Sequence, residues 1–386
     1  MDPVGRCLIC GRDGIITNSI GACVNCLRER PADALAIVRR FRAKWRLSVG
    51  LPIAPPREGD YHCHVCVNEC SIPRGSRGFC GVWVNDGKLR PLGGQGRLVL
   101  MTYLDPLPTN CVATPVCPAV GRGYPRFSRY KHGEYGLFNL AVFMGGCDLD
   151  CLFCQNYEHK IWIAGGKVRG RLRSVGVEEL VKEALNPEVP CICYFGGDPT
   201  PHTPMLIMAS RRILTESERL GQGVKRICWE TNGLVNPVIM REMARLSLVS
   251  GGIVKIDWKA WTPSVYEALT GVDGEKALER LKVNTRIVAE MARERDEPPL
   301  LVVSILLVPG YIDEHEVSGI ANYVAGLMRE FSVNIPIVLL AFHPDHLMRD
   351  LPPTSLRHMM SAVDVVKSAG IREVYVGNEW LLGDYY

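Results

Sequence analysis

From about residue 136 onward the sequence alternates between short apolar runs and longer amphipathic stretches, and this alternation constrains the fold more than any other feature. Apolar runs of strand length occupy residues 139–144, 191–195, 226–229, 252–256, 300–307 and 335–341. Repeated strand–helix–strand units favour a parallel sheet with right-handed crossovers. Six such units are fewer than the eight of a closed TIM barrel. The sequence therefore predicts an α/β fold, a partial TIM-like (βα)6 barrel.

Polar or cysteine-containing segments follow each apolar run. In chain order they read GGCDLDCLFCQN, GGDPTPH, ETNG, DWK, PGYID and HPDH. In parallel α/β folds the reacting groups lie at the carboxyl ends of the strands. We therefore expect these segments to carry the chemistry.

The first of these segments holds three cysteines, Cys147, Cys151 and Cys154, in a C-x3-C-x2-C spacing. Thiolates hold iron–sulfur clusters, and a [4Fe–4S] cluster commonly takes four of them. Three ligands in one loop leave one iron open to a cofactor or substrate, as in catalytic metal sites. A zinc knuckle or buried cysteines are the alternatives, but zinc usually takes four ligands in a closed site. We predict an open [4Fe–4S] cluster.

The segment CDLDCLFC resembles the C-x3-C-x-aromatic-C signature of the radical SAM superfamily. The resemblance implies that the open iron chelates S-adenosylmethionine and that Phe153 packs near its adenine. It also implies an activity, in which the reduced cluster splits S-adenosylmethionine into methionine and a 5′-deoxyadenosyl radical. That radical would abstract hydrogen from a substrate.

Strand-end residues extend the resemblance to residues 136–345. Gly196, Gly197 and Asp198 resemble the GGE-type motif that holds the methionine ammonium, with Asp where Glu is commoner. Four later positions resemble the branch that contains pyruvate formate-lyase activating enzyme and related glycyl-radical activases. These are Glu230, Asp257, Lys259 and His343.

The resemblance implies that these four residues bind S-adenosylmethionine. Acidic groups suit its ribose hydroxyls and sulfonium, and a lysine suits its carboxylate. The alternative is that they are solvated loop residues. In the activases the cysteine motif lies near the N-terminus, whereas 146 residues precede it here. The resemblance therefore implies radical chemistry more firmly than it implies a glycyl-radical substrate.

Two further cysteine clusters precede the motif. The first, in C-x2-C-x12-C-x2-C spacing, suits a zinc ribbon, in which the metal supplies much of the folding energy. It consists of Cys7, Cys10, Cys23 and Cys26. We predict a structural zinc cap there. Docking of a partner, a second Fe–S cluster or a mononuclear iron are the alternatives.

The second cluster resembles a cysteine module of activase-like radical SAM proteins. It consists of Cys63, Cys66, Cys70 and Cys80. Four thiolates suit zinc, one iron or an auxiliary [4Fe–4S] cluster, and ligand count does not choose among them. The spacing of Cys111 and Cys117 is compatible with ligands, a disulfide or free thiols. Three cysteines in strand-like runs are expected to be core residues. These are Cys191, Cys193 and Cys228.

We divide the chain into four parts: a zinc-ribbon-like module (1–30), a basic helical linker (31–58), a Gly- and Pro-rich cysteine module (59–130) and the partial barrel with a C-terminal extension (131–386). The cations of the linker are expected to form a solvated helix face rather than a nucleic-acid patch. They are Arg39, Arg40, Arg42, Lys44 and Arg46. A net charge of +4 does not by itself indicate nucleic acid.

The predicted function is therefore that of a radical SAM enzyme whose substrate the sequence does not identify. No run approaches the ~20 apolar residues of a membrane span, so we expect a cytoplasmic protein without a membrane partner. Its expected partner is a reducing donor such as ferredoxin or flavodoxin, and a protein substrate is a further candidate partner. The alternatives are a non-catalytic Fe–S and zinc scaffold, or an adaptor that binds protein or nucleic acid. Salt-dependent nucleic-acid binding would indicate the latter.

Overall fold

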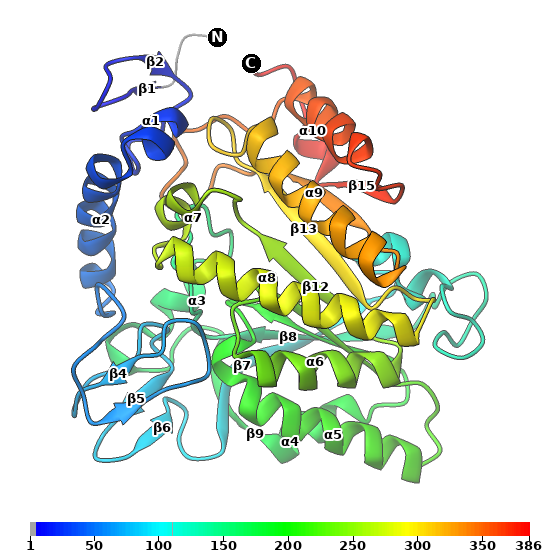
Figure 1. Cartoon of the computed structure of the whole chain (residues 1–386). Coiled ribbons are helices and arrows are strands. Elements are labelled where there is room, and N and C mark those ends of the chain that lie inside the picture. The colour runs from blue at the N-terminus through cyan, green and yellow to red at the C-terminus, as the bar shows by residue number, and fades with distance from the viewer. Residues whose placement is uncertain (1–4, 110) are drawn as a thin grey trace.

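A nine-stranded sheet forms the centre of the computed structural model, which describes residues 5–109 and 111–386 (Figure 1). Its spatial order is β15-β14-β13-β12-β11-β10-β8-β7-β9. The strands are β7 (Arg97–Pro106), β8 (Phe138–Met144), β9 (Arg173–Gly176), β10 (Cys191–Gly196), β11 (Arg226–Thr231), β12 (Val254–Trp258), β13 (Leu301–Leu307), β14 (Ile337–Ala341) and β15 (Val374–Gly377). Among the described residues the order is linear, so the sheet stays open, with β15 and β9 at its edges.

The six predicted strands are confirmed as β8 and β10 to β14, and they pair in parallel. The structure adds a seventh parallel strand, β15, beside β14. It also adds β7, which lies in the Gly- and Pro-rich segment and pairs antiparallel with both β8 and β9. The barrel is therefore partial, as predicted, but its first edge is extended by two strands.

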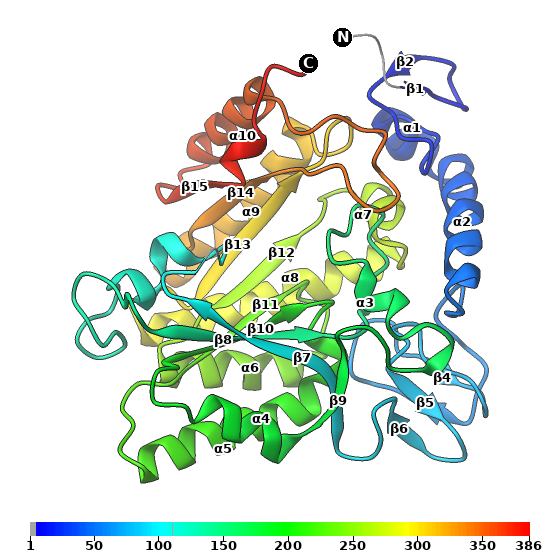
Figure 2. The ribbon, with the colours of Figure 1, turned by 180° about the vertical axis from the view of Figure 1, so that it is seen from behind.

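Most of the helices cover one face of the sheet, and Figure 2 shows the strands in front of them from the opposite side. The helices are α1 (Val24–Glu29), α2 (Pro31–Ser48), α3 (Glu158–Ile161), α4 (Val177–Ala184), α5 (Thr203–Arg219), α6 (Pro237–Ser250), α7 (Pro263–Thr270), α8 (Gly274–Met291), α9 (Glu314–Phe331) and α10 (Leu356–Ser368). Side-chain caps begin several of them. The Asn236 side chain, for example, accepts a hydrogen bond from Val238 N at the start of α6.

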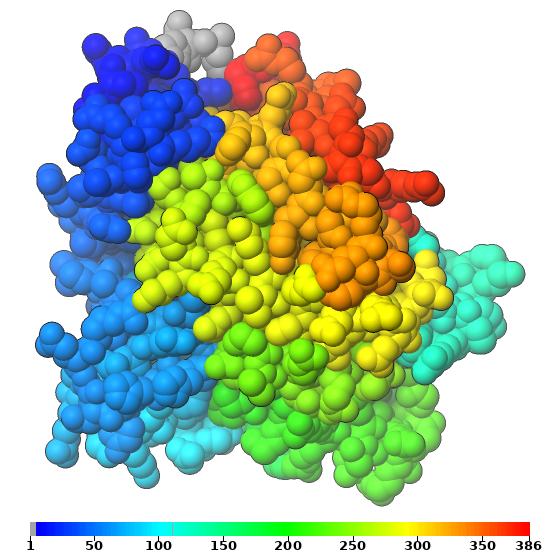
Figure 3. All heavy atoms as spheres, viewed as in Figure 1, coloured from blue at the N-terminus to red at the C-terminus, as the bar shows by residue number. Residues whose placement is uncertain are grey.

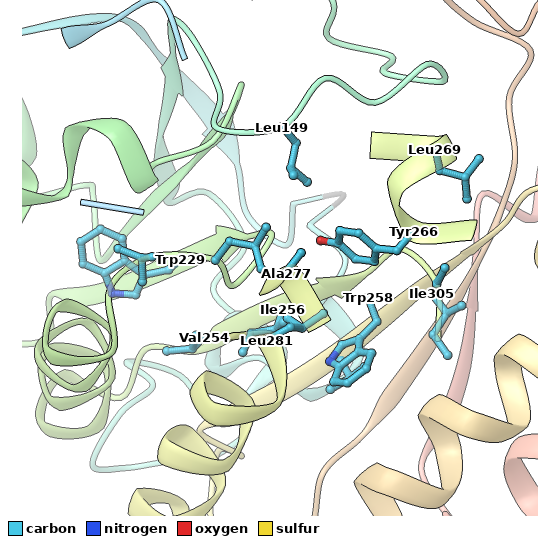
Figure 4. Packing of buried hydrophobic residues seen from close by; sticks show 14 of the residues in the cluster. Leu149, Trp229, Val254, Ile256, Trp258, Tyr266, Leu269, Ala277, Leu281 and Ile305 are labelled. Atoms are coloured by element: carbon cyan, nitrogen blue, oxygen red, sulfur yellow. The ribbon is translucent and has the colours of Figure 1, made fainter. Parts of the chain in front are cut away.

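Side chains alternate between the two faces of each strand. On β10, Ile192 and Tyr194 pack into the main core under the helices, whereas Cys191 and Cys193 belong to a separate cluster on the other face. We call this other face the inner face. Figure 4 shows the main core, with Leu149 from the loop after β8 directed toward Tyr266 of α7.

The N-terminal segments pack on the flank of the barrel. Three short hairpins lie there: β1 (Gly5–Arg6) with β2 (Asp13–Gly14), β3 (Tyr61–His62) with β4 (Ser71–Ile72), and β5 (Trp83–Asn85) with β6 (Leu89–Pro91). Helices α1 and α2 both contact α7. Figure 3 shows these segments, in blue, covering one side of the molecule.

Candidate active site

A pocket of about 220 Å³ lies at the carboxyl ends of the parallel strands. It brings together all the residues predicted from the cysteine motif and the strand-end segments. They are Cys147, Cys151, Phe153, Cys154, Gly196, Gly197, Asp198, Glu230, Asp257, Lys259 and His343. The same pocket is lined by residues that sequence reasoning missed. Among these are His159, Lys160, Asn232 and Lys255.

The loop of residues 145–154, here called the cysteine loop, is held by distant backbone. Asp150 N donates to Thr270 O at 2.7 Å, and Leu152 N donates to Leu269 O at 3.0 Å. The side chain of Asn68 donates to Asp148 O at 2.7 Å. The loop is thus fixed both by the end of α7 and by the upstream cysteine module.

The three cysteines of the cysteine loop are half-buried. Burial raises the pKa of Cys151 to about 12 and raises the pKa of Cys147 well above its ordinary value. Thiolates are the form that binds metal, so bound iron would have to displace the thiol protons. Three sulfur donors that open into one pocket fit a [4Fe–4S] cluster with one iron left for another ligand.

The cysteine loop also contains a buried carboxylate, that of Asp150. Lys160 Nζ lies 2.5 Å from Asp150 Oδ1, and Arg42 and Arg46 of α2 each place a nitrogen 3.4 Å from its carboxylate oxygens. Burial opposes ionisation, but these cations lower the pKa of Asp150 below its usual range. The carboxylate therefore stays charged.

This cluster corrects the expectation that all five linker cations are solvated. Arg42 is 4% exposed and Arg46 is 0% exposed, because both reach inward to Asp150. Arg39 remains exposed and pairs with Glu267 at 2.5 Å. The positions 42 and 46 are four apart and share one helix face, which is the signal that sequence analysis did not use.

His159 of α3 lies beside the third cysteine. Its Nε2 is 3.9 Å from Cys154 Sγ, and the ring is 1% exposed. Burial lowers its pKa well below the ordinary value, so the imidazole is neutral at pH 7. A neutral ring forms no ion pair with the Cys154 thiolate, so the thiolate stays available to iron. The positive charge of this region is then on Lys160.

The Gly196–Gly197 pair allows two loops to approach closely. Gly196 adopts φ +97°, which favours glycine. A Cβ on Gly197 would lie 2.1 Å from the carbonyl oxygen of Gly146 in the cysteine loop. Only glycine fits at this contact.

The carboxylate of Asp198 braces the loops after β10 and β11. It accepts from Thr200 N and Asn232 N, each at 2.8 Å, and from Thr231 Oγ1 at 3.2 Å. These bonds occupy both carboxylate oxygens. In this structure Asp198 therefore organises the turn.

A row of alternating charges crosses the inner face from β11 to β12. Lys255 Nζ lies 3.3 Å from Glu230 Oε2 and 2.9 Å from Asp257 Oδ1, while Lys259 Nζ lies 3.1 Å from Asp257 Oδ2. Burial opposes ionisation of Asp257, but the two lysines hold its pKa well below its usual range. Lys259 Nζ is 5.8 Å from the centre of the Phe153 ring. His343 lies apart at the exposed rim, where its Nδ1 is 2.8 Å from Asp345 Oδ2.

The first upstream cluster is assembled. The thiols of Cys7, Cys10, Cys23 and Cys26 all lie within 4.8 Å of one another. The module that carries them is fixed to the barrel, since Thr17 N donates to Tyr311 Oη at 3.1 Å and Arg28 pairs with Asp313 and Glu316 at 2.7 Å. This geometry fits a four-thiolate metal site, while the identity of the metal stays a prediction.

The second upstream cluster lies around the β3–β4 hairpin. Cys63 N donates to Cys70 O at 2.8 Å, and Phe79 N donates to Cys70 Sγ at 3.5 Å. Burial and neighbouring charges, including those of the other three thiols of this cluster, raise the pKa of Cys66 well above its ordinary value. The ligand role of the four thiols stays a prediction.

Within the described part of the chain, every helix is too short or too polar to span a bilayer.

Comparison with known proteins adds to this geometry. Residues 141–324 match the model of the Radical SAM superfamily. An uncharacterized protein of Methanocaldococcus jannaschii is 24% identical over 321 residues, which cover 82% of this chain and 80% of that protein.

Solved structures with detectable similarity are distant. A domain of pyruvate-formate lyase-activating enzyme from Bacteroides vulgatus is 20% identical with a TM-score of 0.37, and the match covers 48% of this chain and 98% of that domain. Streptococcus suis SuiB is 12% identical with a TM-score of 0.38, and the match covers 61% of this chain and 47% of SuiB.

Proposed function

We propose that this chain, which belongs to the radical SAM superfamily through residues 141–324, cleaves S-adenosylmethionine reductively and abstracts hydrogen from a substrate in an activase-like reaction. The observation that carries the proposal is that Cys147, Cys151 and Cys154 open into the same pocket as the strand-end residues of β10 to β12. When bound there, a [4Fe–4S] cluster with S-adenosylmethionine supplies the 5′-deoxyadenosyl radical. A non-catalytic scaffold would not need both features in one pocket.

The pocket residues suit the polar groups of S-adenosylmethionine. The carbonyl oxygens at Gly196 and Gly197 accept from the methionine ammonium, and Lys259 donates to its carboxylate. Phe153 provides an aromatic face for the adenine. The carboxylate of Asp257 holds Lys259 in place and offers its remaining acceptor capacity to ribose hydroxyls.

The reaction needs an electron from outside the chain. We propose a small low-potential donor such as ferredoxin or flavodoxin, and a substrate that enters over the inner face. His343, an exposed residue that lines the pocket, would lie on that route. A protein substrate of the activase kind is one candidate.

The decisive experiment is anaerobic. The full-length protein is reconstituted with iron and sulfide, reduced with dithionite and given S-adenosylmethionine, and 5′-deoxyadenosine is quantified. The test variant is the triple substitution Cys147→Ala, Cys151→Ala and Cys154→Ala. The control is the double substitution Cys191→Ala and Cys228→Ala, which removes buried cysteines away from the cysteine loop.

We expect 5′-deoxyadenosine from the wild type and the control and none from the triple variant. A fully clustered wild type without product is examined by EPR. A change in the reduced cluster's spectrum on adding S-adenosylmethionine would support cleavage gated by a missing substrate. An unchanged spectrum would overturn the proposal and leave the scaffold function.

A further inference from the structure

Five of the cysteines gather on the inner face, away from the three clusters discussed so far. Cys191 and Cys193 lie on β10, and Cys228 lies on β11 opposite Cys193 in the strand register. Cys111 and Cys117 come from the segment that crosses this face after β7. The sequence predicts Cys191, Cys193 and Cys228 to be core residues, and they are buried. The segment that crosses the inner face brings Cys111 next to Cys193.

One subset of these groups has the arrangement of metal ligands. The thiols of Cys111 and Cys193 and a carboxylate oxygen of Glu230 all lie within 4.8 Å of one another. Cys111 Sγ lies 3.0 Å from Glu230 Oε1. The three residues come from three different segments, so they are brought together by the fold and not by local sequence.

A cavity beside these three groups is large enough for one small species. A cavity of about 20 Å³ is bordered by all three residues. A site of this size holds about one water-sized particle. The other inner-face cysteines and Lys255 also border this cavity. The three ligand atoms that lie within 4.8 Å of one another are two sulfurs and one carboxylate oxygen, a combination that suits zinc or ferrous iron rather than magnesium or calcium.

The charges also balance for a divalent ion. A divalent cation that displaces the protons of Cys111 and Cys193 leaves the net charge of the site unchanged. Glu230 presents Oε1 to the cavity while its Oε2 lies 3.3 Å from Lys255 Nζ, which fixes the carboxylate from behind.

We propose that Cys111, Cys193 and Glu230 bind a divalent transition-metal ion, zinc or ferrous iron, through two thiolates and one carboxylate. Three protein ligands leave a coordination position open, as in catalytic zinc sites. Glu230 and Lys255 line both this cavity and the pocket beside the cysteine loop, so the ion lies next to that pocket. This assignment makes Glu230 a metal ligand, in place of the contact with S-adenosylmethionine that the family resemblance implies.

The test uses the full-length protein purified without oxygen and loaded with Co²⁺ as the probe. The variant is the double substitution Cys111→Ser and Cys193→Ser. Its matched control is Cys191→Ser with Cys228→Ser, because these two sulfurs lie 3.8 Å apart on the same inner face. Bound cobalt per chain and the thiolate-to-cobalt charge-transfer absorption are measured for each protein.

We expect the test variant to lose about one equivalent of cobalt and the matching absorption, while the control keeps both. Glu230→Gln, which preserves the side-chain shape, should bind this cobalt at least about tenfold more weakly. This second variant keeps the test decisive if the serine pair does not fold. Equal cobalt in wild type, test and glutamine variants, or equal loss in the test and control pairs, would overturn the site. Neither result depends on cleavage of S-adenosylmethionine.

Discussion

Lys160 Nζ lies 2.5 Å from Oδ1 of Asp150, a residue of the cysteine loop, and both side chains are buried. Arg42 and Arg46 approach the same carboxylate, so three cations surround one anion. Burial opposes the charge of Lys160, but Asp150 first, and then Cys154 and Cys147, raise its pKa. With three cations beside one carboxylate, the net charge of this group is positive. A cluster held by the three cysteines would take up an electron close to this net positive charge.

Lys160→Met should lower the reduction potential of the cluster by on the order of tens of millivolts, because a nearby positive charge stabilises the reduced state. The measurement is a redox titration followed by EPR on the reconstituted protein. The exposed Lys167→Met serves as a control of equal charge change. A potential that shifts equally in both proteins would contradict the role of this buried charge.

Lys259→Met should weaken binding of S-adenosylmethionine by about tenfold, or about 1.4 kcal/mol, through loss of a charged donor in the pocket. Equilibrium dialysis against the clustered protein gives the dissociation constant. Lys276→Met changes an exposed lysine on α8 and should leave the constant unchanged. An unaltered constant in the Lys259 variant would remove this residue from the binding site.

Cys10→Ser should release the metal of the four-cysteine module and lower the melting temperature, because structural metals contribute folding free energy. Cys10 is the exposed member of the group, so its substitution disturbs packing least. Metal content by mass spectrometry and thermal denaturation are the readouts, and the iron of the central cluster should stay at the wild-type level. A variant that keeps both the metal and the melting temperature would speak against a metal-supported cap.

His202 should make the protein sensitive to acid. The ring is 0% exposed and its Nε2 lies 2.9 Å from the carbonyl oxygen of Gly145 at the start of the cysteine loop. Burial lowers its pKa to about 4, below the ordinary value near 6.5. The folded state therefore disfavours the protonated ring, so stability is complete above the unfolded pKa and falls as the pH drops toward 4. The loss is about 2 kcal/mol at pH 5.

The variant His202→Gln tests the predicted loss of stability in acid. Its side-chain amide keeps a donor for the Gly145 carbonyl but does not titrate. Acid unfolding followed by near-UV circular dichroism should show a lower midpoint pH for the variant than for the wild type. The same midpoint, or a higher one, would show that His202 does not govern this part of the acid response.

Much of the fold could be predicted because its signals are local. Apolar runs fix the parallel strands, and the spacing of Cys147, Cys151 and Cys154 identifies the cysteine loop from a few adjacent residues. The predicted strand-end residues also meet in one pocket, because the carboxyl ends of parallel strands lie together.

Other features depend on contacts between distant segments. Arg42 and Arg46 look like surface cations until Asp150, more than one hundred residues later, is placed against them. The inner-face group of Cys111, Cys193 and Glu230 depends on where the chain crosses after β7. The shared helix face of Arg42 and Arg46 is visible in the sequence, but no local pattern identifies the distant residue that either group meets.

The backbone bonds from the cysteine loop to Leu269 and Thr270 also set an order of events during synthesis. Helix α2, with its arginines, leaves the ribosome before the loop, whereas the end of α7 that holds the loop in shape follows much later. A nascent chain that stops before residue 270 carries all three cysteines without the backbone that fixes their positions. Insertion of iron and sulfide is therefore expected to wait until α7 has emerged, which leaves the thiols exposed to oxidation for the intervening part of translation.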